Sequence, residues 1–251
     1  MVTHPPSGPL RHRRRRRRLL PVTLVSILTL VAVAIAVDRI AVAVADHELA
    51  THIQSSQHLS HTPSVSIRGF PFLTQLAARK VNEVDVTVRD FAAGAQGRTL
   101  QIARLSVALH EVHLAKSFSA VRIDSASATA DITYAALTST LGVRIGYGGA
   151  TSDGTGRIAA TASTAVLGQT VSGAVSAQVH VSPDNVLSFV NPQVSVDGSP
   201  ISAPAIVDAL AAVFKLPVSL LRLPFGLTVS SVRASPVALV VILTGTGLSY
   251  G

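Results

Sequence analysis

The sequence predicts an α+β protein in which a long, mainly antiparallel sheet with a few helices follows one N-terminal transmembrane helix. A single uncharged apolar run lies near the N-terminus, and most of the remaining chain alternates apolar and polar residues, as strands with one buried face do. Helical patterns are few and scattered, which favours the α+β class over an alternating α/β fold. Of the 251 residues, 48% are hydrophobic and only 14% are charged, which does not fit a disordered chain.

The apolar run extends from Leu19 to Val37 and contains no charged residue. As a helix rising about 1.5 Å per residue, it nearly matches the roughly 30 Å hydrocarbon core of a bilayer. Arginines precede the run and Asp38 follows it, so the positive-inside rule places residues 1–18 in the cytoplasm and the rest outside. The alternative is a secreted protein, because Ala34-Ile35-Ala36 fits a signal cleavage site. The length of the run favours an uncleaved single-pass anchor in the cytoplasmic membrane.

The net charge of +8 is concentrated in the N-terminal segment. Residues 1–37 hold seven arginines and no acidic residue, which leaves 14 basic and 13 acidic residues in the rest of the chain. A nucleic-acid-binding protein should carry its basic patch on the folded surface, so we expect no nucleic-acid partner. The chain has no cysteine, which excludes thiolate catalysis, cysteine zinc sites and disulfides.

The exported part begins with residues 38–63, which we predict to be a connecting amphipathic helix because apolar residues recur at steps of three and four. Residues 64–251 then form the extracytoplasmic domain. A short strand at Ser64–Arg68 and a short helix at Phe72–Lys80 are expected on either side of the turn Gly69-Phe70-Pro71.

The rest of the domain is predicted to be mostly strand, with rows of alanine that would leave a sheet face either closely packed against a helix or lined by an internal groove. One such row is Ala126, Ala128 and Ala130. The expected elements are strands at Val84–Arg89, Leu105–Leu109 and Val121–Ile123, a helix at Tyr134–Leu141 that Gly142 closes, a loop at Gly146–Gly156, a hairpin at Arg157–Val181, a helix at Ala203–Lys215, and strands at Leu227–Ala234 and Val237–Leu243.

Motifs for catalysis are lacking in the sequence. It contains no nucleophile elbow, phosphate-binding loop, dinucleotide fingerprint or calcium loop. His47 and His52 are five residues apart on a helix, which places them roughly 140° apart around its axis. His110 and His113 would face opposite sides of a strand. We therefore expect no metal site, no cofactor and no enzymatic activity.

The segment Val65–Leu76 (VSIRGFPFLTQL), within the stretch Asp38–Phe91, resembles the LmeA-like phospholipid-binding family of actinobacterial cell-envelope proteins. Leu223–Leu227 (LPFGL) lies in the expected late position and an export segment precedes the whole, so the resemblance covers about residues 38–251. The sequence departs from the family pattern at Ser235-Pro236, where a glycine-containing turn is expected.

This resemblance implies a phospholipid-binding domain on the outer side of the cytoplasmic membrane, with a role in maintaining envelope lipid or lipoglycan. It also implies a curved sheet with the apolar tunnel of tubular, BPI-like lipid-binding folds. Phospholipid and the cytoplasmic membrane are therefore the expected partners. The rival hypothesis is an envelope scaffold whose sheet edges recruit a partner protein, without a lipid cavity.

Three of the seven phenylalanines lie in proline-containing turns, namely Phe70, Phe72 and Phe225. Turn aromatics are more exposed than strand aromatics on average, so we predict that these three contribute to a lipid-contacting mouth. The alternative is that they plug the ends of the core. Neighbours in the same two motifs complete the predicted site: Leu73, Leu76 and Leu227.

Overall fold

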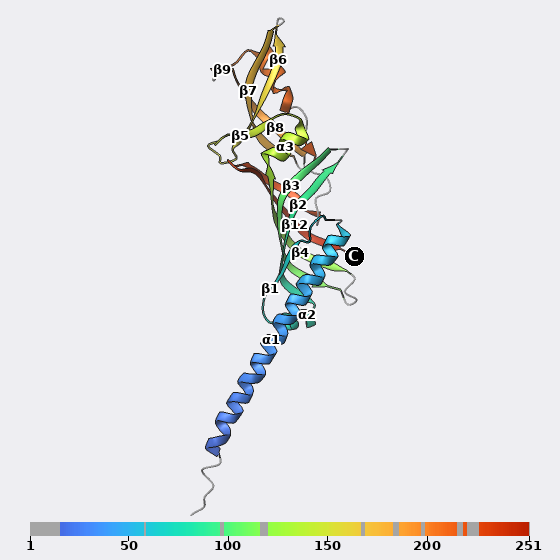
Figure 1. The fold of residues 1–251 in the computed structure, drawn as a ribbon. Coiled ribbons are helices and arrows are strands. Elements are labelled where there is room, and N and C mark those ends of the chain that lie inside the picture. Colours follow the sequence, from blue (N-terminus) through green and yellow to red (C-terminus); the bar gives the residue numbers. More distant parts are fainter. Residues whose placement is uncertain are drawn as a thin grey trace, which may run out of the picture.

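The computed structural model shows an elongated molecule in which helix α1 (Arg16–Ser56) projects from one end. A six-stranded sheet occupies the middle of the molecule and a second sheet lies at the far end (Figure 1). Both sheets are antiparallel and open, which confirms the predicted α+β fold with a mainly antiparallel sheet. The structure describes residues 16–57, 59–95, 98–115, 120–166, 169–182, 186–196, 199–214, 218–219 and 226–250.

The middle sheet, called sheet A, has the strand order β1-β2-β3-β4-β12-β11. Its last two members come from the end of the chain, so β12 pairs with both β11 and β4. The central strands are long enough to run from the α1 end of the domain toward the second sheet (Figure 1). The bounds are β1 Ser64–Arg68, β2 Lys80–Ala95, β3 Arg98–Leu114, β4 Val121–Thr133, β11 Thr228–Ala234 and β12 Ala238–Tyr250.

The far sheet, called sheet B, has the order β10-β8-β7-β6-β5, with β9 paired to β8. Three short helices complete the domain, and α3 is closed by Gly142 in the left-handed conformation, as predicted. The strands are β5 Ile145–Gly149, β6 Arg157–Val166, β7 Gln169–Val181, β8 Val186–Val196, β9 Ser199–Ile201 and β10 Val218–Ser219. The helices are α2 Phe72–Ala77, α3 Tyr134–Leu141 and α4 Pro204–Ala211, followed by a 3-10 turn at Ala212–Phe214.

Several element boundaries differ from the sequence prediction. Helix α1 is continuous through the apolar run and the connecting segment, and it ends at Ser56. Helix α2 stops at Ala77, because Arg79 adopts a positive φ of 53° and β2 begins at the next residue. The prediction of a loop at Gly146–Gly156 is wrong for its first four residues, which belong to β5.

A line of backbone irregularities, called the kink line, crosses sheet A near its α1 end. It consists of Asn82, Glu111, Asp124 and Gly247, which lie at the same level on β2, β3, β4 and β12 and lack partners in the strand registers. Glu111 and Gly247 have positive φ values of 55° and 62°. The registers on the two sides of the line keep the same offset, so the four strands leave the ladder together at this level and resume it in step.

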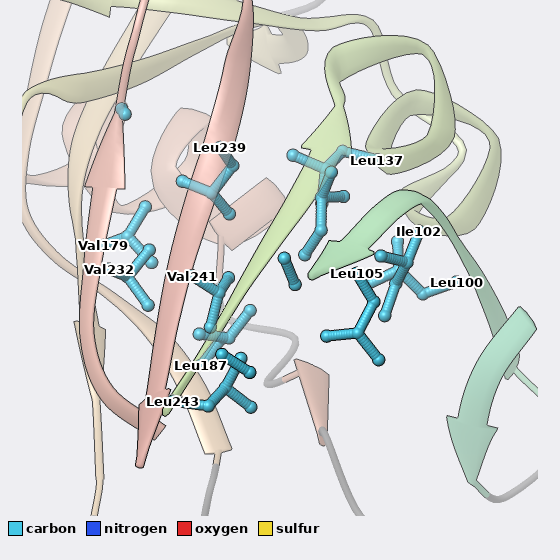
Figure 2. Packing of buried hydrophobic residues seen from close by; sticks show 14 of the residues in the cluster. Leu100, Ile102, Leu105, Leu137, Val179, Leu187, Val232, Leu239, Val241 and Leu243 are labelled. Atoms are coloured by element: carbon cyan, nitrogen blue, oxygen red, sulfur yellow. The ribbon is translucent and has the colours of Figure 1, made fainter. Parts of the chain in front are cut away.

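The hydrophobic core continues from sheet A into sheet B. Figure 2 shows Leu187 of β8 beside Val241 and Leu243 of β12, and all three side chains are at most 1% exposed. The alanine row on β4 is also buried, and its partners in the register are larger residues of β3 and, except for one glycine, of β12. Most of the small side chains in this central strand therefore lie between larger ones.

Two backbone contacts join the loop before β6 to sheet A. The N–H of Ala234 donates to the carbonyl of Thr155 at 2.7 Å. Gly156 has a φ of +70°, and a Cβ at this position would lie 2.3 Å from the Ala234 carbonyl oxygen. Glycine is required here because the two backbones approach so closely.

The turn between β11 and β12 is closed by Ser235, at the position where the family pattern suggested glycine. Its hydroxyl accepts the N–H of Ala238 at 3.1 Å, and its carbonyl accepts the hydroxyl of Tyr134 at 2.5 Å. Burial raises the pKa of Tyr134 to about 12. The phenol therefore remains a hydrogen-bond donor at neutral pH and links α3 to this turn.

Arg157 is a buried cation, 8% exposed, at the start of β6. Its guanidinium donates to the hydroxyl of Ser176 at 3.0 Å and to the carbonyls of Ser176 and Asn191 at 2.8 Å and 2.5 Å. The β7–β8 ladder shifts register beside Ser176, and Asn191 has a φ of 52°. Arg157 thus satisfies carbonyls at a ladder irregularity where the two strands are out of step.

Replacing Arg157 with Met should destabilise the protein by about 3 kcal/mol, because buried carbonyls lose a charged donor. Urea unfolding would show a lower midpoint with an unchanged slope. The matched control is Arg233→Met at an exposed arginine of β11, which should shift stability by no more than about 0.5 kcal/mol. Equal effects of the two variants would show that the guanidinium bonds contribute little.

Candidate lipid-contacting site

The junction between the apolar part of α1, the predicted anchor, and the domain lies at Asp38. Large apolar side chains between Val22 and Val37 are exposed, whereas Asp38 is 3% exposed and Ala50 is 6% exposed. From Asp38 onward, α1 packs beside β1 and α2 (Figure 1). The first half of the helix is therefore exposed, whereas its second half packs on the domain.

Two carboxylates of α1 attach the helix to the domain. Oδ1 of Asp38 accepts the N–H of Leu73 at 2.9 Å, in the first turn of α2. Oδ1 of Asp46, about two helical turns further on, accepts the N–H of Ile67 at 2.8 Å on β1. Charge-assisted hydrogen bonds of this kind are stronger than neutral ones, so the anchor has a defined orientation relative to the sheet.

The G-F-P-F motif forms the turn that these bonds hold against α1. Gly69 has a φ of +102°, and a Cβ there would lie 2.5 Å from the side-chain nitrogen of Gln75. Pro71 occupies the N-cap position of α2, and its side chain offers no acceptor for the free N–H groups in the first turn of that helix. Phe72 is only 4% exposed, so its ring packs inside the protein and holds the turn in place.

Phe70 and Leu73 project from this turn with 59% and 41% of their surfaces exposed. The guanidinium carbon of Arg39 lies 5.2 Å from the centre of the Phe70 ring, within the range of a cation–π contact. The same guanidinium forms an ion pair with Asp38 at 2.8 Å. Two apolar side chains and one cation are thus exposed immediately beside the apolar helix.

The six predicted site residues do not form one cluster. Phe70 and Leu73 are exposed, whereas Phe72 and Leu227 are buried and Leu76 is half-buried. Leu227 precedes β11, which lies at the opposite edge of sheet A from β1. For Phe72, the burial fits the alternative that it plugs an end of the core, and Leu227 belongs to the hydrophobic core itself. Phe225 lies outside the described residues.

The outer face of sheet A carries two adjoining grooves of about 530 and 670 Å³ that the sequence analysis did not anticipate. Both are lined by Ser64, Thr87 and Ser106. Arg89 and Arg104 face each other in the β2–β3 register and line the larger groove. In the sequence, the signal for these grooves was the row of polar residues that alternate with the buried ones along the strands and therefore face outward. The larger groove is lined by hydroxyl and guanidinium groups and suits a polar group, whereas the lining of the smaller groove also includes apolar side chains of β3, β4 and β12.

Comparison with known families identifies the family of this chain. The sequence model of one family, described as LmeA-like phospholipid-binding, matches residues 36–244. The chain belongs to this family. No curated protein and no solved structure matches the chain. The matched region begins two residues before Asp38, so the junction of this LmeA-like protein lies within the part of the chain that defines its family.

Among the residues that the structure describes, the LmeA-like chain also contains one group of side chains that could bind a metal ion. This group lies on and beside the kink line. Ligand atoms of Glu111, His113 and Asp124 lie within 4.8 Å of one another. The sequence analysis paired His113 only with His110 and missed this group. Glu111 forms an ion pair with Lys80, whose pKa it raises by hydrogen bonding, and Asp124 lies 3.7 Å from Arg122. Both carboxylates therefore already have cationic partners.

Adding a chelator should leave the thermal midpoint of unfolding unchanged, because Lys80 and Arg122 already balance the carboxylates of the Glu111–His113–Asp124 group. Differential scanning calorimetry of the full chain, with and without chelator, tests this expectation. A fall in the midpoint that zinc restores, and that Asp124→Asn abolishes, would identify the group as a metal site.

Replacing Asp38 with Ala should release α2 from the anchor helix, because the first turn of α2 loses its acceptor. Hydrogen exchange would show faster exchange of the Leu73 amide. Glu48→Ala is the matched control, since Glu48 is an exposed carboxylate on the same helix. Unchanged protection of Leu73 in the Asp38→Ala chain would mean that packing alone holds the junction.

Proposed function

We propose that this protein is a membrane-anchored carrier of phospholipid whose domain lies on the extracytoplasmic side and takes up lipid beside its own anchor. The observation that supports this most directly is the exposure of Phe70 and Leu73 next to α1 in a member of a phospholipid-binding family. The role that fits is maintenance of envelope lipid or lipoglycan, without a catalytic group.

The anchor part of the proposal is supported by the length and composition of α1. Within the described residues, the segment Val22–Ser56 is long and apolar enough to cross a membrane, with a mean hydropathy of 2.4 in its most apolar window. A signal sequence would have the same properties. The arginine-rich segment before the helix supports an orientation with the N-terminus in the cytoplasm.

Lipid transfer at this site requires no chemical step. Each buried CH₂ group of an acyl chain is worth about 0.8 kcal/mol, in a bilayer or in a protein. Moving a lipid between the two is therefore nearly isoenergetic, and the cost lies in crossing water. A lipid-contacting surface attached directly to the anchor shortens that crossing.

The residues at the junction have complementary roles in this proposal. Phe70 and Leu73 contact the acyl chains, while buried Phe72 holds the turn in place. Arg39 lies over Phe70 with about half of its side chain exposed. Its guanidinium can therefore meet a lipid phosphate at the position where the apolar contact ends.

Phe70→Ser and Leu73→Ser should each reduce uptake of phospholipid with little loss of stability, because both side chains are largely exposed. Phe72→Ser should instead lower the free energy of unfolding by about 3–5 kcal/mol, as for other buried phenylalanines. The measurement is transfer of a fluorescent phospholipid from vesicles to the full chain in detergent-free nanodiscs, with urea unfolding in parallel.

Val237→Ser is the matched control, since Val237 is 81% exposed in the turn between β11 and β12. This variant should take up lipid as the wild type does. Normal uptake by both junction variants would show that the site lies elsewhere. Native mass spectrometry that finds no phospholipid bound to the purified chain would reject the carrier function and favour the envelope scaffold.

A further inference from the structure

The exposed apolar surface of α1 continues beyond Val37, where the sequence pattern places the end of the membrane span. Ile40 and Val44 are 65% and 57% exposed. Both lie on the side of the helix away from Asp38, because Ile40 is about 200° and Val44 about 240° further around its axis. The next charged residue after Arg39 is Asp46.

The two charged residues inside this longer apolar stretch, Asp38 and Arg39, are paired with each other. Asp38 is 3% exposed and is bonded to the Leu73 amide and to Arg39. Arg39 is held by Asp38 and by the ring of Phe70. A charge at membrane depth is costly unless it is paired or reaches the interface, and the domain itself meets that condition here.

The domain contributes two further apolar side chains at the same level. Phe70 lies beside Arg39, and Leu73 is bonded through its amide to Asp38. Phe70 and Leu73 on the domain side, together with Ile40 and Val44 on the opposite side of α1, form a ring of exposed apolar residues around the helix, called the apolar collar.

The dimensions of a bilayer agree with a boundary above this collar. At about 1.5 Å per residue, the stretch Leu19–Val44 spans about 39 Å, which exceeds the roughly 30 Å of the hydrocarbon core and approaches the roughly 40–45 Å of a bilayer with its headgroup regions. The level of Arg39 and Phe70 is about 8 Å below Val44. Interfacial protein segments insert about 5–10 Å into the boundary between headgroups and acyl chains.

We propose that the membrane surface lies at the level of Val44 and that the apolar collar is inserted into the outer leaflet of the membrane that α1 crosses. This inference rests on the proposed membrane anchor and adds the depth and orientation of the domain. The molecules that contact the apolar collar are lipids of the outer leaflet, because the collar is continuous with the apolar surface of the spanning helix. Phe70 and Leu73 then meet acyl chains without any movement of the domain.

The chain contains no tryptophan, so one introduced tryptophan reports on one position. The full chain is reconstituted into vesicles of phosphatidylcholine and phosphatidylglycerol, with or without phosphatidylcholine brominated on its acyl chains. Val31→Trp probes the middle of the anchor and Phe70→Trp the collar, with Leu73→Trp as a second collar reporter. Val237→Trp is the control at an exposed position on the far end of sheet A.

Brominated lipid is expected to quench the emission of the Phe70→Trp or Leu73→Trp variant and to leave that of Val237→Trp unquenched. Bromines near the headgroup should quench the collar variants more than bromines near the chain end, and the order should reverse for Val31→Trp. Quenching of Val31→Trp with none in either collar variant would overturn the collar inference and leave the anchor intact. No quenching of Val31→Trp would reject the anchor, and with it the inference.

Discussion

The carboxylate of Asp38 is the group on which the placement of the whole domain depends. It stands where α1 changes from a bare apolar helix into one that packs on protein, and it accepts the amide of Leu73. Helix α2 has only Pro71 at its N-cap, so its first turn has no acceptor of its own. The anchor provides that acceptor, and the turn bearing Phe70 is held against the anchor as a result.

A rigid junction determines how the domain is oriented relative to the apolar half of α1. A flexible linker would let the domain sample many distances from that helix. Here α1 is one helix through the junction, and the bonds from Asp38 and Asp46 reach two different elements of the domain. The exposed apolar residues of the turn therefore keep one position relative to the apolar half of α1, while the grooves on sheet A lie on a different surface.

The kink line has a comparable role within the sheet. At this level each of four strands contains one residue that breaks the alternation of buried and exposed side chains. All four of these residues are polar or glycine, which suits exposed backbone that has left the ladder. The kink line lies close to α2, since the N–H of Asn82 donates to the side-chain oxygen of Gln75 at 3.0 Å, so the line and the exposed turn beside α1 are at the same end of the domain.

Sequence alone determined the properties that depend on neighbouring residues. These include the apolar helix, the short strand and turn around Gly69, the helix closed by Gly142, and the antiparallel character of the domain. The predicted strand at Leu105–Leu109 was right in type but too short, because the period-two pattern of β3 is interrupted at Glu111 on one side and at Ala103, opposite Asp90 of β2, on the other. A pattern that shifts by one residue looks like the end of a strand.

Only the tertiary structure decided which of the predicted site residues face solvent. Phe70 and Phe72 are two residues apart in one motif, yet one is 59% exposed and the other 4%. The difference arises because Asp38, more than thirty residues earlier in the chain, binds the first turn of α2 and orients it. Local sequence specifies that a turn forms there, but the direction in which its side chains point is set by a contact between distant segments.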